Sequence, residues 1–287
     1  MQGSLSLQHG VLYVGRHEAS AHVRPYDLDG VPLSAGFSFR GPSRAPVELA
    51  GFAVDPDHQV WIADAAEAAV WRFTLFGREV GRWTASANGD APGSFGRLVD
   101  LDVEERDGRL ECLVASGGWR RHAVQLFDGD GRLLTSLRSE GDPQSNFHGV
   151  SRVARDGART YVCEAHAGRV QVFRSGGFEF LFRLAGRGKA LLEPVALAPL
   201  EDGRMLVACG GDESCLVLVD RAGRVERRLA TAGEGPGEVL DPTDVVVELG
   251  RAEAATRVAV IDRSAERVQV FTLEGRCQGA IAALPGE

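Results

Sequence analysis

Apolar and polar residues alternate along this chain in short segments that end at glycine turns. Six segments end in an aromatic or branched residue, and a glycine follows each of them four residues later. These segment ends lie 47, 54, 46, 46 and 52 residues apart, and they are Tyr26, Phe73, Phe127, Phe173, Val219 and Phe271. A period of about 50 residues through the whole chain indicates a repeat architecture rather than two conventional domains.

One period contains four short strands. Residues 150–153 and 161–164 are expected to be two short strands, separated by Asp156 and Gly157, a pair that supplies the positive φ angles of a hairpin turn. Residues 170–173 alternate in polarity, and a glycine pair leads from them into residues 178–184. Four antiparallel strands of this kind form one blade of a β-propeller, and neighbouring blades must stack because none can bury its apolar face alone.

The pattern predicts an all-β, six-bladed propeller of four-stranded antiparallel blades. The expected single domain is 1–287, with blades near residues 3–40, 47–86, 94–139, 146–185, 191–231 and 238–284. Each blade has four strands from its own segment, so the ring is expected to close without a strand exchanged between the chain ends. Four phenylalanines at equivalent positions are expected to be buried between blades: Phe73, Phe127, Phe173 and Phe271.

The last repeat carries a family resemblance. Residues 233–247, with the run Pro-Thr-Asp-Val-Val-Val at 242–247, are followed by Val-Ile-Asp at 260–262 and Arg-Val-Gln-Val-Phe at 267–271. This order resembles an NHL repeat, and residues 147–150 and 169–173 match nearly as well. The resemblance implies the six-bladed fold. It leaves function open, because NHL-like propellers include protein-binding scaffolds, RNA-binding modules, and metal-dependent lyases and lactonases.

Composition and charge narrow the choice of partner. Apolar residues make up 44% and charged residues 25%, as in an ordinary globular domain, and no apolar run is long enough to cross a bilayer. The net charge of -8 makes nucleic acid an unlikely partner, since phosphate binding needs a concentrated basic surface. The first ten residues lack the pattern of a secretory signal, so a cytoplasmic location is expected. Nearly all basic residues are arginines, which suits a GC-rich bacterial genome.

The five cysteines do not form a disulfide framework of the secreted type. Their number is odd, and Cys112 and Cys163 lie in or beside strands, where a small buried residue fits. Cys209 and Cys215 flank one tight loop, so a disulfide between them is left as an alternative to two free thiols.

Strand direction identifies one end of the propeller as the end where a site is expected. The start of each first strand, the end of each second strand and the loop to the third strand all lie there. His17, Trp119, Arg120 and Arg263 are the expected binding residues on this loop face. The opposite face is expected to hold short Asp-Gly and Gly turns with few side chains that grip a partner.

Blade 4 offers a candidate metal or catalytic site on the loop face. His148, Glu164 and His166 provide two imidazoles and a carboxylate, ligands that suit Zn²⁺. Streptogramin-lyase-like propellers use histidine at the rim position assigned to His148, although they draw such histidines from successive blades. In the alternative interpretation Glu164 replaces the aspartate seen at Asp64 and Asp262 and accepts backbone N–H bonds at its loop.

Asp100 and Asp244 are further weak metal candidates. Two carboxylates at a narrow rim could hold Ca²⁺, which needs six to eight oxygen ligands. The alternative is a backbone-capping role, which is common at this position of NHL-like repeats.

Three classes of function follow. The first choice is a non-enzymatic scaffold or adaptor that binds another protein through its polar loop face and requires no cofactor. The alternative is a metal-dependent lyase or hydrolase with Zn²⁺ or Ca²⁺ at the channel mouth. A binder of small-molecule ligands or nucleic acid is the third.

Overall fold

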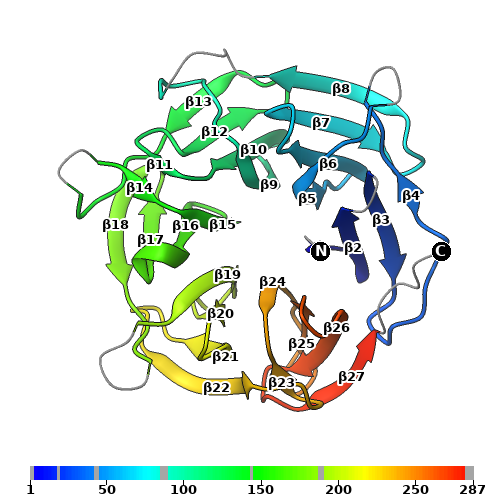
Figure 1. The fold of residues 1–287 in the computed structure, drawn as a ribbon, viewed down its shortest axis with the longest axis vertical. Helices are drawn as coiled ribbons and strands as arrows, with labels where there is room; N and C mark the ends of the chain where they lie inside the picture. The colour runs from blue at the N-terminus through cyan, green and yellow to red at the C-terminus, as the bar shows by residue number, and fades with distance from the viewer. Residues whose placement is uncertain are drawn as a thin grey trace.

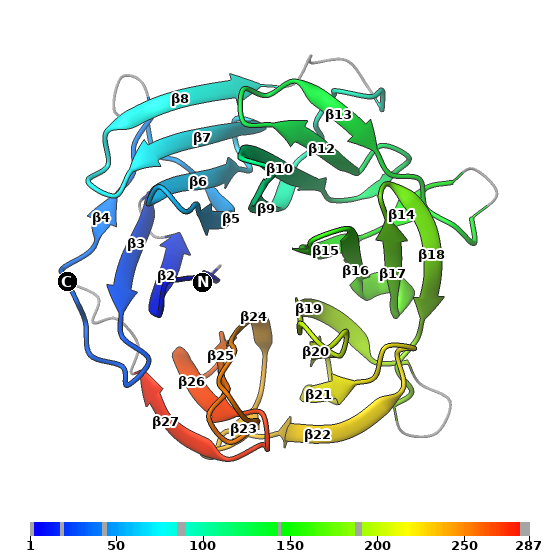
Figure 2. The ribbon, with the colours of Figure 1, turned by 180° about the vertical axis from the view of Figure 1, so that it is seen from behind.

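Six blades form a closed ring around a central channel in the computed structural model (Figures 1 and 2). The structure describes residues 3–17, 20–41, 45–84, 90–142, 145–186 and 191–281. Each blade contains four antiparallel strands in sequence order from the channel outward. The predicted fold class is therefore confirmed.

The first three blades are built from strands as follows. Blade 1 comprises β1 (Gly3–Gln8), β2 (Val11–His17), β3 (Ala21–Tyr26) and β4 (Phe37–Ser38). Blade 2 comprises β5 (Leu49–Val54), β6 (Gln59–Asp64), β7 (Ala69–Thr74) and β8 (Glu79–Thr84). Blade 3 comprises β9 (Leu98–Arg106), β10 (Arg109–Ser116), β12 (Val124–Asp128) and β13 (Leu133–Ser136).

The last three blades repeat this plan. Blade 4 comprises β15 (Val150–Asp156), β16 (Arg159–Glu164), β17 (Arg169–Arg174) and β18 (Gly177–Phe182). Blade 5 comprises β19 (Glu193–Pro199), β20 (Met205–Gly210), β21 (Cys215–Val219) and β22 (Val225–Ala232). Blade 6 comprises β24 (Pro242–Glu248), β25 (Arg257–Asp262), β26 (Arg267–Thr272) and β27 (Cys277–Ile281).

Four small elements accompany the blades. β11 (Trp119–Arg120) pairs with β14 (Phe147–His148) in a separate two-stranded sheet, and β23 (Glu238–Val239) adds a parallel edge to β22. A 3₁₀ turn, η2 (Ala165–Ala167), connects β16 to β17. Among the residues described, no helix is long and apolar enough to span a membrane.

The turn glycines explain the period of the sequence. Gly223 has a φ of 80°, and its N–H donates to the carbonyl of Asp220, whose side chain accepts from two further amides of the turn. A side-chain carboxylate and a left-handed glycine together fix the hairpin between the third and fourth strands. In blade 4 the left-handed residues are Ser175, at 50°, and Gly176, at 83°, rather than Gly177.

The core lies between adjacent blades. Phe73, Phe127, Phe173 and Phe271 are buried as predicted. Phe173, for example, packs with Leu113 and Val124 of blade 3. Each blade therefore completes the apolar face of its neighbour.

The ring closes by side-chain packing, as expected. β1 pairs with β2, and β27 pairs with β26, so no described strand crosses between blades 1 and 6. Leu5 and Val14 of blade 1 pack with Ile261, Val270 and other apolar residues of blade 6. Blades 1 and 6 are joined by this shared cluster, and their described strands form no ladder with one another.

Candidate functional site

One position in each innermost strand determines what fills the channel. The residue at this position lies opposite the second-strand residue directly before Arg16, Asp64, Ser116, Glu164, Cys209 or Asp262. The six residues are Ser4, Gly51, Asp100, Arg152, Ala196 and Asp244. The ring at this level thus contains one long cation, two carboxylates and three small residues.

Arg152 reaches from blade 4 across the channel. Its Nη1 lies 2.8 Å from Asp100 Oδ1, and its Nη2 lies 3.2 Å from Asp244 Oδ2. The guanidinium also donates to three backbone carbonyls, those of Gly3, Ala50 and Thr243. Through these contacts one guanidinium joins blades 1, 2, 3 and 6 to blade 4 at the centre of the ring. Only 9% of the Arg152 side chain is exposed.

The two carboxylates also bind the edges of the next blades. Asp100 Oδ2 accepts from the Val153 N–H at 2.9 Å, and Asp244 Oδ2 accepts from the Leu5 N–H at 2.7 Å. Burial raises the pKa of Asp100 to about 7, although Arg152 acts to lower it. Both aspartates are therefore structural links between blades, as the backbone-capping interpretation proposed.

A small residue is required beside this ion pair. A Cβ atom on Gly51 would lie 2.3 Å from Asp100 Oδ1 and 2.9 Å from Asp100 Cα. Glycine in blade 2 therefore leaves the space that the Asp100 carboxylate occupies.

Arg152 lines cavities on both sides of this ring. The cavity toward the loop face measures about 320 Å³ and is lined by residues such as Ser151, Thr243 and Arg263. The other measures about 290 Å³ and includes Asp102, whose pKa is raised to about 6 by burial. A Ca²⁺ ion between Asp100 and Asp244 would have to displace the guanidinium, so the arrangement does not fit that ion.

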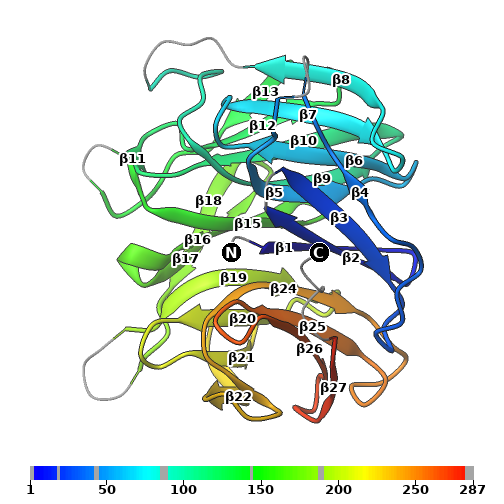
Figure 3. The ribbon, with the colours of Figure 1, turned by 45° about the vertical axis from the view of Figure 1, so that its right-hand side comes forward.

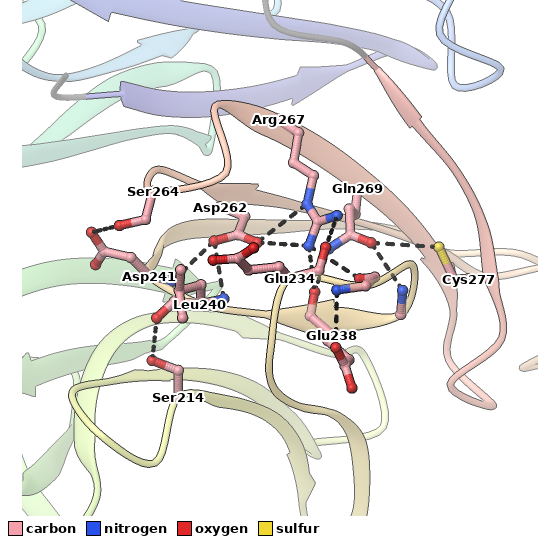
Figure 4. Close-up of polar contacts among 12 residues, drawn as sticks. Ser214, Glu234, Glu238, Leu240, Asp241, Asp262, Ser264, Arg267, Gln269 and Cys277 are labelled. Atoms are coloured by element: carbon pink, nitrogen blue, oxygen red, sulfur yellow. Dashed lines mark hydrogen bonds and ion pairs between the residues drawn. The ribbon is translucent and has the colours of Figure 1, made fainter.

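Glu164, the carboxylate of the blade 4 candidate site, is buried and fully engaged. Its Oε1 accepts from the His148 N–H at 2.7 Å, and its Oε2 accepts from Arg169 Nε at 2.7 Å and from Gln171 Nε2 at 2.6 Å. Asp262 makes the equivalent contacts in blade 6, with Arg267 at 3.0 Å and the N–H groups of Leu240 and Asp241 (Figure 4). The carboxylate anchors a loop in both blades.

The two histidines of the candidate site lie apart from the channel ring. His148 Nε2 contacts Asp142 Oδ2 at 3.1 Å, while His166 is exposed on η2 with its ring against Gly149. The strand register places Arg152, and not His148, at the channel position of blade 4. The predicted assignment of His148 to this position is therefore corrected. Within the described part of the chain, no three His, Cys, Asp or Glu side chains are grouped to hold a metal ion.

Trp119 forms the most prominent aromatic feature of the loop face. Its side chain is 68% exposed, and its ring lies 4.3 Å from that of His148 at an interplanar angle of 36°. Pairing between β11 and β14 places the two residues directly opposite each other. The aromatic pair is therefore held by backbone hydrogen bonds and by the Asp142 contact.

The other predicted binding residues are distributed around the loop face. Arg263 is paired with Asp241 at 2.7 Å and lines the channel mouth. Arg120 lies over Gly96 and 3.8 Å from Asp90. His17 is the last residue of β2, and its side chain lies outside the described residues. In Figure 3 the β11 segment and η2 project at the same end of the ring.

The opposite face differs from the expectation of short, featureless turns. Phe76, in the turn between β7 and β8, is 83% exposed and contacts Phe37 edge to face. Val31 and Leu33 are exposed in the connection from β3 to β4. The turns on this face need glycine for their backbone conformation, but apolar side chains can stand beside the glycines.

Arg152 and Asp142 are the functional-site residues that sequence reasoning did not identify. Arg152 is the third residue of its strand, as Asp100 and Asp244 are of theirs. Their partners on the second strands are Cys163, Ala115 and Ile261. This alignment was the available signal. Asp142 had none, because its contact with His148 depends on a loop conformation.

Comparisons with known sequences identify no relative of this chain. The chain matches no protein-family model, and no curated protein sequence is a detectable relative. Membership of the NHL family therefore remains a prediction.

Three similar structures illustrate the range of this fold. The nidogen/laminin complex aligns with a TM-score of 0.64 and 15% identity, over 95% of this chain and 93% of that one. The BBS1N structure in complex with ARL6DN gives 0.59 and 11%, over 96% and 77%. Streptogramin B lyase gives 0.60 and 11%, over 99% and 83%. At these identities the likeness establishes the propeller and not the activity.

Proposed function

We propose that this propeller is a non-enzymatic scaffold that binds another protein through its loop face. The observation that carries the proposal is the exposed Trp119 ring, which packs against the His148 ring on a paired strand. Aromatic and arginine residues that are ordered before binding are typical anchors of protein interfaces, because little side-chain entropy is lost on association. Arg120 and Arg263 add cationic groups to the same face.

The use of the channel carboxylates supports this choice over a metal-dependent lyase or hydrolase. Asp100 and Asp244 bind Arg152, and Glu164 binds Arg169, so the acidic groups of the candidate metal sites already have cationic partners. Propellers of similar shape occur in the nidogen/laminin and BBS1N–ARL6DN complexes, which is consistent with a protein partner.

The proposal is tested with a double variant, Trp119→Ala with Arg263→Glu. Tagged parent and variant proteins are used to capture partners from the source cells, and each partner found is then titrated as a purified protein. We expect the variant to weaken binding at least tenfold while its melting temperature stays near that of the parent, since Trp119 is 68% exposed and the Arg263 side chain 47% exposed.

The matched control changes the opposite face, with Asp130→Ala and Asp156→Ala. If the control abolishes binding and the loop-face variant retains it, the partner binds the opposite face and the proposal is wrong. Metal content is measured on the same purified protein. A stoichiometric divalent ion would contradict the scaffold proposal and favour the lyase or hydrolase class.

A further inference from the structure

Blade 5 departs from its neighbours at one repeated position. In blade 4 the last residue of the second strand, Glu164, lies opposite Arg169, and in blade 6 Asp262 lies opposite Arg267. Both pairs are ion pairs, at 2.7 Å and 3.0 Å, and Figure 4 shows the second. They close the base of the hairpin loop between the second and third strands.

Two thiols occupy this position in blade 5. Cys209 lies opposite Cys215, and Cys209 also lies opposite Pro194 of the first strand, as Glu164 lies opposite Val150. The strand register therefore makes the cysteine pair equivalent to the two ion pairs. Both cysteines are fully buried, and both are free thiols.

The thiols interact with each other. The pKa of the Cys215 thiol is lowered, chiefly through its interaction with the Cys209 thiol and also by the nearby Arg228 guanidinium, although burial acts to raise it. Burial raises the pKa of Cys112 and Cys163, which lie within β10 and β16. The cross-strand register distinguishes the pair from these two cysteines, because neither of them lies opposite another cysteine.

We propose that Cys209 and Cys215 form a reversible disulfide when the protein meets a small-molecule disulfide such as oxidised glutathione. Opposed residues of antiparallel strands have Cβ atoms about 4.5 to 5.5 Å apart, and only a small approach brings them to disulfide geometry. A covalent bond then takes the place that an ion pair holds in blades 4 and 6. This inference stands apart from the proposed binding function.

The exchange takes place in two steps. The Cys215 thiolate attacks one sulfur of oxidised glutathione, forming a mixed disulfide and releasing one glutathione thiolate. The Cys209 thiolate then attacks the Cys215 sulfur and releases the second glutathione. The two cysteines lose two electrons and two protons, and one glutathione disulfide is reduced to two thiols.

The hairpin between the cysteines provides the route for the oxidant. Residues 210–214 include Gly210 and Gly211, and a cavity of about 230 Å³ beside this loop is lined by Asp212, Ser214, Arg228 and their neighbours. Ser214 Oγ donates to the carbonyls of Gly211 and Leu240, which ties the loop to blade 6. Local opening of this hairpin would expose the Cys215 sulfur without unfolding the blade.

Trypsin offers a direct test, because cleavage after Arg204 and Arg221 releases both cysteines in one peptide, residues 205–221. The native protein is incubated with oxidised glutathione, denatured in an alkylating reagent, digested and analysed by mass. We expect this peptide to be unalkylated and two hydrogen atoms lighter than its reduced form. Dithiothreitol should restore double alkylation, and the peptides of Cys112 and Cys163 should be alkylated throughout.

Cys215→Ser is the matched variant. Oxidation should raise the melting temperature of the parent, because the bond restricts the unfolded chain, and leave that of the variant unchanged. Double alkylation of the parent peptide after incubation both at room temperature and just below the melting transition would overturn the proposal. A stable glutathione adduct on either cysteine as the end product would also overturn it.

Discussion

Replacing Arg152 with alanine removes the only long cation of the channel ring. The substitution leaves Asp100 and Asp244 buried and facing one another without their shared counter-charge. It also removes three donors from the carbonyls of Gly3, Ala50 and Thr243. Blade 4 would then lose its central link to the rest of the ring.

The expected loss of stability is large. Breaking a buried pair by removing one partner destabilises a protein by about 3 to 5 kcal/mol, because an uncompensated buried charge remains. With an unfolding entropy of about 2.1 cal/mol/K per residue, a chain of this length would melt roughly 5 to 8 °C lower. Equilibrium urea denaturation, followed by fluorescence and far-UV circular dichroism, measures the free energy of unfolding directly.

The dependence on pH identifies the cause. Burial already raises the pKa of Asp100 to about 7, and loss of Arg152 removes the charge that lowers it. A carboxyl with a raised pKa in the folded state destabilises the fold above that pKa, and the penalty disappears as the pH falls toward its unfolded value near about 4. The difference between Arg152→Ala and the parent should therefore be larger at about pH 8 than at about pH 5.

Arg174→Ala is the control. Its ion pair with Glu179 is on the surface, with 54% of the arginine side chain exposed, so we expect a loss below about 1 kcal/mol. A loss for Arg152→Ala as small as this would refute the counter-charge argument. A large loss that is equal at both pH values would assign the effect to packing instead.

Two further predictions concern packing in the ring. Phe173→Ala should lower the free energy of unfolding by about 3 to 5 kcal/mol through lost burial and a residual cavity, and an unchanged urea midpoint would contradict the proposed repeat register. Gly51→Ala should lower it by about 1 to 3 kcal/mol, because its Cβ would meet Asp100 at 2.3 Å, whereas Gly279→Ala, with no atom within 4 Å, should change it by less than about 0.5 kcal/mol. Equal effects of the two glycine substitutions in the same urea titration would show that the clash at Gly51 is relieved at no cost.

The sequence by itself determined the repeat and its consequences. Strand alternation, turn residues and the spacing of Phe73, Phe127, Phe173 and Phe271 are local properties that recur in every period, so they predicted the blade count and the buried positions. The same reasoning predicted closure without strand exchange, because each terminal segment contains four strands of its own.

Only the tertiary structure decided which polar groups meet. Arg152, Asp100 and Asp244 come from three blades, separated by 52 and 92 positions, and join only when the ring closes. β15 has the same one-residue bulge as β5, β9, β19 and β24, and this shared register places Arg152, and not His148, level with Asp100 and Asp244. Local sequence specifies a blade, but the contacts across the channel depend on the register and rotation of all six blades together.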